Sequence, residues 1–539
     1  MFLAGTSAAA CHSPEHKAPV QEPEGSVQFE TKLPEKPVIP IVYAQDAGEQ
    51  APKLSIEERQ RRALLYSAGA NLVNLVALEQ LLEAEAARRS SAGLRVGGTE
   101  ITEEAVDAKV QEQVDMFLAQ SPNGDFWRQR ILEGYTEDAY RRTVALVLRV
   151  SDMFFPADPE IWPVEQLKLV FDSEAVNSHW QPVQQELDGR LEMKRKGQAF
   201  PEMPSDFVFS YIMLPGVFAW MRANADIQYP SHGLPEGVAL RVDGKDYKTA
   251  DLLEQARPLI SPVAEQLADE WVTAMDLAER ELRAEGHWLS KGTLDALWEA
   301  ERKDYEGTIF THEQTVLEFL GFPSMEHYRQ YFEARRSFRS TLPDPFPEEA
   351  IQQQIAKRGT FLGLGKVTAD VILIAAVEPA ALEFSMNPKI YRPGADPFKQ
   401  YEATAQEVAQ MLQDGESFDD LLLEYSNFPP RVEGGNFLQR DRGRFGSLSR
   451  ADLRVLLGES DFTDVLQGYS IGDDIFFDAE IGAVYGPVRG PLGWYLYRVS
   501  ARDEPTQVLD PKNDPRQAYQ LEDDLISQSF LAFVNGLRR

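Results

Sequence analysis

The sequence predicts an α+β protein that is mainly helical, with a duplicated helical segment and a C-terminal α/β domain built on a small antiparallel sheet. Three observations predict this class. Apolar residues recur at helical spacing over long stretches, one helical pattern occurs twice at a constant offset, and apolar strand patterns gather in the last third of the chain. Of the 539 residues, 43% are hydrophobic, which is enough to form several cores.

The charge and the sparse metal-binding residues exclude several classes of function. A net charge of -32 repels phosphate backbones and anionic lipid, so we expect no nucleic-acid partner. Such acidity would keep the protein soluble while it binds apolar polypeptides. Alternatively, it is a general property of protein surfaces in the source organism. The seven histidines form no HExxH pattern or tight cluster, and one cysteine permits no disulfide within the chain. We therefore expect no metal and no cofactor.

Residues 1–60 predict an export signal remnant followed by a disordered tether. The small residues before Cys11 resemble the end of a bacterial lipoprotein signal, in which Cys11 would carry the lipid. The chain that follows is rich in Pro, Glu and Lys and lacks hydrophobic periodicity. However, no Lys or Arg precedes the apolar stretch, which is short for a signal sequence. An exported protein of the periplasm or cell envelope, held to the membrane only through lipid, and a tail with an incidental cysteine both remain open.

An internal duplication relates residues 61–155 to residues 237–350. ITEEAVD places Thr102 before a helical pattern, and LSKGTLD places Ser290 in the same position, where a hydroxyl can cap a helix (290 − 102 = 188). A second match joins Gly134 to Gly321 (321 − 134 = 187). Within both copies, a long apolar stripe at helical spacing precedes the matched motifs, at residues 72–82 and 263–278. Two matches at nearly one offset indicate a repeated unit.

The repeated unit is similar to the N-terminal chaperone domain of SurA-like proteins. The likeness rests on a long helix, a hydroxyl-capped helix start and a G-[YF] pair before a Tyr-Arg helix. It implies helices that hold unfolded polypeptides; the alternative is a generic helical repeat. Residues 156–236 are predicted to form a connecting α/β segment. Within them, Phe207–Trp220 predicts two buried strands, or a strand and a helix start, around a turn at Pro215-Gly216.

Residues 360–503 contain the most specific patterns. An apolar strand, an amphipathic helix, E-Y-S, G-G-N-F, G-P-V and a closing G-W-Y-L-Y-R-V strand follow one another in the order of the parvulin family of peptidyl-prolyl isomerases, which this domain resembles. The resemblance is interrupted by an insertion. The corresponding ranges are 367–374 for the first strand, 401–412 for the helix, 448–474 for the insertion, 493–499 for the closing strand and 504–539 for a C-terminal segment whose helix is expected at 517–537.

Prolyl isomerisation needs neither a nucleophile nor a cofactor. The protein must hold the proline ring in an apolar pocket and favour the twisted amide, against a barrier of ~18–20 kcal/mol. The resemblance implies two histidines and a Cys or Asp beside that pocket. Their positions fall on Val371, Tyr495 and Phe428 in this chain, and no histidine follows His327. The polar half of the family site is therefore missing.

The apolar half of the implied site is better preserved. Phe445 falls on the Met/Leu position of the pocket, and Leu448 and Phe477 are expected neighbours. Tyr495 is the candidate catalytic residue because its hydroxyl could replace the second histidine, although it does not titrate near neutral pH. One function is a prolyl isomerase acting in the folding or assembly of exported proteins. Others are a non-catalytic holdase for unfolded or proline-containing polypeptides, and an envelope scaffold.

Overall fold

The computed structural model describes residues 39–44, 54–98, 101–122, 124–173, 176, 180–199, 203–204, 208–305, 310–362, 364–376, 397–429, 441–503, 505–506 and 509–538. The helices are α1 (Ile56–Ala68), α2 (Ala70–Ser91), α3 (Glu103–Gln120), α4 (Phe126–Leu132), α5 (Glu137–Phe154), α6 (Val164–Phe171), α7 (Trp180–Arg195), α9 (Leu214–Ala223), α10 (Thr249–Ala256), α11 (Pro262–Ala284), α12 (Lys291–Asp304), α13 (His312–Gln314), α14 (Met325–Arg339), α15 (Glu348–Leu362), α17 (Pro397–Gln413), α18 (Phe418–Tyr425), α19 (Arg450–Leu457), α20 (Asp461–Gln467), α21 (Ile471–Asp473) and α22 (Pro515–Leu537). The strands are β1 (Ile227–Gln228), β2 (Val238–Val242), β3 (Lys245–Lys248), β4 (Lys366–Ala375), β5 (Arg444–Leu448), β6 (Val484–Gly490) and β7 (Gly493–Asp503).

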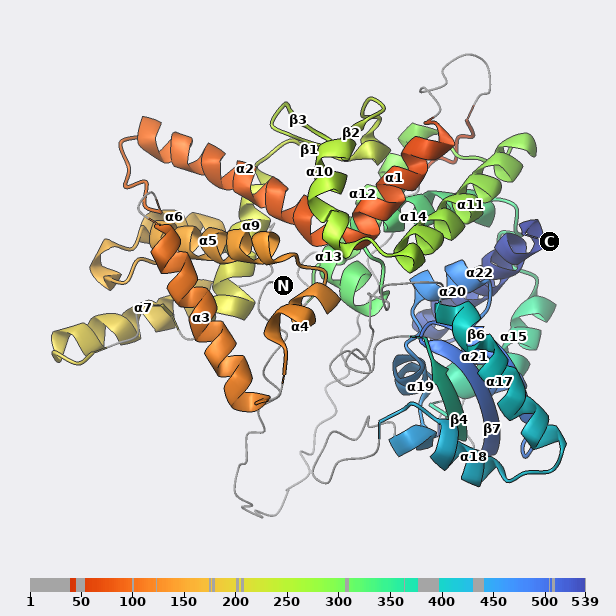
Figure 1. The fold of residues 1–539 in the computed structure, drawn as a ribbon. Helices are drawn as coiled ribbons and strands as arrows, with labels where there is room; N and C mark the ends of the chain where they lie inside the picture. The colour runs from red at the N-terminus through yellow and green to blue at the C-terminus, as the bar shows by residue number, and fades with distance from the viewer. Residues whose placement is uncertain are drawn as a thin grey trace, which may run out of the picture.

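This architecture confirms the α+β class. Helices dominate the chain, and the strands form two small sheets in the orders β1-β2-β3 and β5-β4-β7-β6, in which every pairing is antiparallel. The smaller sheet lies among the helices, whereas the larger sheet lies with the C-terminal helices at the other side of the molecule (Figure 1). None of the helices in the described part of the chain is both long and apolar enough to cross a membrane.

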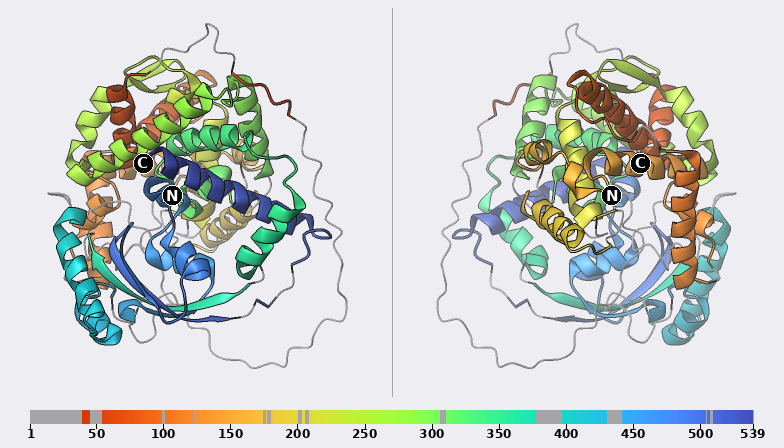
Figure 2. Two further views of the ribbon diagram at one scale, coloured as in Figure 1. Left: turned by 90° about the vertical axis from the view of Figure 1, so that its right-hand side faces the viewer. Right: turned by 90° about the vertical axis from the view of Figure 1, so that its left-hand side faces the viewer.

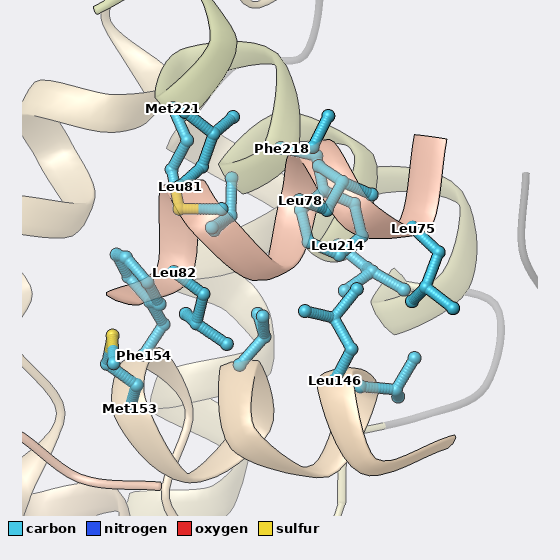
Figure 3. Packing of buried hydrophobic residues seen from close by; sticks show 14 of the residues in the cluster. Leu75, Leu78, Leu81, Leu82, Leu146, Met153, Phe154, Leu214, Phe218 and Met221 are labelled. Carbon is cyan, nitrogen blue, oxygen red and sulfur yellow. The ribbon is translucent and has the colours of Figure 1, made fainter. Parts of the chain in front are cut away.

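The first helical segment, residues 70–154, packs its apolar face against α9. Leu78, Leu82 and Leu146 lie in one buried cluster with Leu214 and Phe218 (Figure 3). The predicted strands within Phe207–Trp220 are wrong for the described residues, because residues 208–223 are helical throughout. A π-helical turn at Phe209–Met213 leads directly into α9, whose first turn contains Pro215. Proline has no N–H to donate, and Pro215 lies where the wider π-helical turn, closed by the Leu214 N–H and the Phe209 carbonyl oxygen, passes into the α-helix.

The second helical segment, residues 262–339, has the same element order as the first. Thr102 caps α3 and Ser290 caps α12, each by accepting a hydrogen bond from the backbone N–H three residues further on. Thr136 and Ser324 cap α5 and α14 in the same way (324 − 136 = 188). The caps are local interactions, which explains why the sequence reveals these helix starts.

Tertiary contacts within the two segments also correspond. Arg141 forms an ion pair with Asp107, and Arg329 forms one with Asp295 at 2.6 Å; both residues are 188 positions further along (295 − 107 = 188). The Tyr140 hydroxyl donates to Gln113 at 2.6 Å, and the Tyr328 hydroxyl donates to Glu301 (301 − 113 = 188). The same helix pairs are therefore joined by the same kinds of contact in both segments.

The C-terminal sheet domain, residues 366–503, is built around β4, which lies between β5 and β7. The expected strand at 367–374 and helix at 401–412 form as β4 and α17. Because successive strand side chains point to opposite faces, β4 contributes to two cores. Ile372 and Ile374 pack with α17 and α18. Val371 faces the other core, which is covered by α19, α21 and a π-helical turn at Asp474–Asp478.

Two elements join the sheet domain to the second helical segment. The ring of Phe462, from α20, lies 4.9 Å from the Trp271 ring and 5.7 Å from the Phe322 ring, measured between centroids. The C-terminal helix α22, which the sequence predicts at 517–537, buries Phe530 against Tyr331 and Phe338. Figure 2 shows α22 lying across the helical layer above the larger sheet. The insertion and the C-terminal helix thus hold the two parts together.

Candidate functional site

The predicted proline pocket maps to one face of the larger sheet. Val371 lies on β4, Phe445 on β5 and Tyr495 on β7, while Phe428 follows α18. The Phe428 ring lies 5.2 Å from the Phe445 ring and 6.5 Å from the Tyr495 ring, between centroids. The fold therefore brings together four of the six residues chosen from the sequence, and Leu448 belongs to the same buried cluster.

These five side chains form a packed core. Val371 and Tyr495 are 0% exposed, Phe428 is 2% exposed, and Phe445 and Leu448 are each 7% exposed. Leucines and isoleucines from α19, α21 and the following π-helical turn complete the cluster, so the insertion covers the sheet face to which the predicted pocket maps. A proline ring needs an accessible cavity, whereas these five side chains, among the described residues, are at most 7% exposed and pack against one another. Their role in binding substrate stays a prediction.

The Tyr495 hydroxyl has two structural partners. It donates to the Leu457 carbonyl oxygen at 2.7 Å and accepts from the Leu492 backbone N–H at 3.2 Å. Leu457 is the last residue of α19, where carbonyl groups lack partners within the helix. The hydroxyl therefore fastens the inserted helix to the turn between β6 and β7.

We expect Tyr495→Phe to lower the free energy of unfolding by about 1–3 kcal/mol, because a buried carbonyl and a buried N–H would each lose a partner. Urea unfolding followed by near-UV circular dichroism measures this loss. The control is Tyr519→Phe, since the Tyr519 ring is 54% exposed on α22. Equal stability of the Tyr495 variant and the parent would show that these two hydrogen bonds do not stabilise the fold.

The other two residues predicted from the sequence are Phe477 and Cys11. Phe477 packs at the edge of the same core, and the guanidinium of Arg358 from α15 covers its ring at 3.8 Å from the centroid. Arg358 also binds Asp473 at 2.7 Å and Asp524 at 2.9 Å. Cys11 and the G-G-N-F motif at 434–437 lie outside the described residues.

A buried ionic network, which sequence reasoning missed, holds the insertion in place. Arg454 of α19 bonds Asp464 of α20 at 2.7 Å, and Arg450 bonds Asp473 at 2.5 Å. Burial raises the pKa of Asp473, but the guanidinium groups of Arg450, Arg358 and Arg454 outweigh it and lower that pKa to about 2. The network links three helices of the insertion to α15 and α22, so it stabilises the covered state of the sheet.

A groove of about 770 Å³ lies at the other side of the molecule, among α2, α6 and α9. Three large aliphatic side chains on its wall are exposed to solvent: Leu94 is 50% exposed, Ile161 is 49% exposed and Leu169 is 71% exposed. The exposure of Leu169 follows from α6, which is apolar on two faces and buries Leu167 completely while Leu169 points outward. An apolar wall open to solvent is typical of a surface that binds a polypeptide.

The polar side of this groove is held by a buried charge pair on α2. Arg89 bonds Glu85 at 2.9 Å and also donates to Gln166 of α6 at 2.6 Å. Burial raises the pKa of Glu85, but hydrogen bonds from Arg88, Arg89 and Gln166 outweigh it and lower that pKa. Glu85 and Arg89 are both nearly inaccessible to solvent. Their bonds to Gln166 therefore fix the position of α6 relative to α2, and with it the width of the groove. The spacing of Glu85 and Arg89 suits an ion pair within one helix, but nothing local in the sequence indicates the contact between Arg89 and Gln166 of α6.

No family model and no curated protein matches this chain. Solved structures with a similar arrangement include PrsA from Bacillus subtilis, which is 17% identical over 55% of this chain and 90% of that chain, with a TM-score of 0.15. The peptidylprolyl isomerase PrsA from Bacillus cereus is 14% identical over 54% of this chain and 88% of its own, with a TM-score of 0.19. PrsA from Bacillus anthracis is 12% identical over 49% and 93%, with a TM-score of 0.19. Overlap this low determines neither the fold nor the activity of this chain.

Proposed function

We propose that this protein is an exported folding factor that binds unfolded polypeptides and does not isomerise prolines. The observation that carries the proposal is the covered sheet face. The hydroxyl of Tyr495 is engaged by Leu457 and Leu492, and the side chains around it are buried. Isomerase chemistry requires that a proline ring enter this face, whereas binding elsewhere does not. The proposed export, and the lipid anchor at Cys11, rest on the sequence alone.

The groove among α2, α6 and α9 is the proposed client surface. Its exposed wall, formed by Leu94, Ile161 and Leu169, fits the apolar side chains of an extended client segment. Arg88 and Glu165 stand on the rim, where their hydrated charges remain in water while the apolar wall is covered. The net charge of -32 keeps such complexes soluble.

We expect Leu169→Glu to weaken binding of reduced, carboxymethylated lactalbumin, which stays unfolded, by about fivefold, because one partly buried leucine contact is lost. Fluorescence anisotropy of the labelled client measures the affinity. Leu423→Glu is the matched control, since Leu423 is a leucine 49% exposed on α18, far from the groove (Figure 1). Equal loss in both variants would contradict the assignment of the groove.

The isomerase alternative is tested with the same parent protein. A protease-coupled assay on a proline peptide should show no acceleration at high protein concentration if the sheet face remains covered. Acceleration that Tyr495→Phe changes would instead favour a retained prolyl isomerase that opens its insertion. If the parent protein neither binds the unfolded client nor accelerates isomerisation, the results favour the third function, an envelope scaffold.

A further inference from the structure

Residues 39–44 lie as an extended chain against the second helical segment, about 250 residues away in sequence. Tyr43 forms an antiparallel β-bridge with Leu289, in the turn between α11 and α12. The segment reads Ile-Pro-Ile-Val-Tyr-Ala, which is an apolar, proline-containing sequence of the kind exposed by unfolded proteins. We call the turn and the first residues of α12, residues 287–293, the α11–α12 corner.

The corner binds the segment through main-chain groups. The Ser290 N–H donates to the Val42 carbonyl oxygen at 2.8 Å, and the Ala44 N–H donates to the Trp288 carbonyl oxygen at 2.8 Å. The Val42 N–H donates to the Thr293 hydroxyl at 3.2 Å. These contacts resemble the addition of a strand to a sheet edge, a recognition mode that reads the backbone of an extended chain.

Two side chains of the bound segment contact the second helical segment: the Tyr43 ring lies edge-on to the His287 ring, with centroids 6.3 Å apart, and Ala44 packs against the buried core. Ile41 and Val42 are each 51% exposed, and Tyr43 is 40% exposed. The corner itself is rigid: Leu289 is 1% exposed and its N–H donates to the buried Ser337 hydroxyl at 3.1 Å. A preformed site that binds a chain through its backbone accepts many sequences.

The corner is particular to the second helical segment. The position equivalent to Thr293 in the first segment is Ala105 (293 − 188 = 105), which has no hydroxyl to accept a backbone N–H. Thr293 is 4% exposed, so its hydroxyl is directed by the packing of α12. The hydroxyl that binds the segment is therefore present at the start of α12 and absent from the corresponding start of α3.

We propose that the α11–α12 corner is a binding site for extended polypeptide, and that residues 39–44 are its tethered occupant, which a segment of another polypeptide replaces. The tether supplies its own segment at an effective concentration on the order of millimolar, so a free peptide competes only when the tethered segment is weakened. This site is separate from the groove among α2, α6 and α9, and its test does not depend on the function proposed for that groove.

The test uses the full chain and a fluorescent peptide with the sequence of residues 38–45. Val42→Pro combined with Ala44→Pro removes both N–H donors of the tethered segment and leaves the corner intact. We expect the labelled peptide to bind this variant about tenfold more tightly than the parent chain, since two competing hydrogen bonds are lost. Adding Thr293→Val should return the peptide affinity to the parent level or below.

Controls separate the corner from nonspecific binding. Glu299→Ala changes a side chain that is 55% exposed on α12 and lies outside residues 287–293, so it should leave peptide affinity unchanged in the double-proline variant. Far-UV circular dichroism should show the same helix content in every variant. The proposal is overturned if the peptide binds the parent and the double-proline variant equally, or if Thr293→Val leaves binding to the double-proline variant unaltered.

Discussion

Replacing Arg454 by methionine should lower the free energy of unfolding by about 3–5 kcal/mol, because it leaves buried carboxylates without their counter-charge. Arg454 binds Asp464 at 2.7 Å and lies 4.0 Å from Asp473, and its side chain is 11% exposed. Asp464 is still more deeply buried, with a side chain 5% exposed. One of its oxygens, Oδ1, already lacks a hydrogen-bond partner, so loss of the guanidinium leaves the carboxylate poorly solvated.

Two further variants separate this effect from a general loss of charge. Arg257→Met removes an exposed pair with Glu254, whose side chains are 73% and 68% exposed, and should leave the free energy of unfolding nearly unchanged. Arg454→Met combined with Asp464→Leu should recover more than half of the lost stability, since both charges are then absent. Urea unfolding monitored by near-UV circular dichroism gives all three values. A loss for Arg454→Met no larger than for Arg257→Met would mean that the network does not hold the insertion.

Replacing Glu326 by glutamine should change how stability depends on pH. Glu326 lies in the first turn of α14, is 5% exposed, and accepts hydrogen bonds from the Ser231 N–H at 3.0 Å and hydroxyl at 2.8 Å. Burial is the main cause that raises its pKa from 4.5 to about 7; the Ser231 hydrogen bonds and Arg62 oppose the rise, and Glu333 adds to it. The folded protein therefore holds a proton that the unfolded chain releases above pH 4.5.

The sign follows from proton linkage. Between pH 4.5 and 7 the folded state binds more protons at Glu326 than the unfolded state, so the stability that this group supports falls as the pH rises. From the two pKa values, 7 and 4.5, the loss is on the order of 3 kcal/mol by pH 8. Because glutamine does not ionise, the Glu326→Gln variant should become more stable relative to the parent across this range.

Unfolding free energies of the parent and the Glu326→Gln variant at pH 5, 6, 7 and 8 test this prediction. The control is Glu299→Gln, which removes one carboxylate from a side chain that is 55% exposed on α12. For that variant, the difference from the parent should stay constant with pH. Parallel curves for the parent and Glu326→Gln would show that Glu326 ionises as easily in the folded protein as in the unfolded chain.

The sequence alone determined the elements whose causes are local. Thr102, Ser290 and Ser324 cap helices through hydrogen bonds that span three residues, so each helix start is visible from the residue types and their spacing. The same holds for β4, whose apolar run predicts a buried strand, and for α22, whose apolar stripe predicts a packed helix. The grouping of Val371, Phe445 and Tyr495 was predicted from the resemblance to parvulins, and the three side chains lie in one buried cluster.

Only the tertiary structure decided whether that face is open. The insertion at 448–474 was visible as extra chain, but its position over the sheet depends on Arg454 meeting Asp464 and Asp473, and on Phe462 reaching Trp271. The helical form of residues 208–223 likewise depends on neighbouring helices, because its apolar residues also suit strands. Contacts between residues distant in sequence decide that the insertion covers the sheet face, and local sequence patterns contain no information about such contacts.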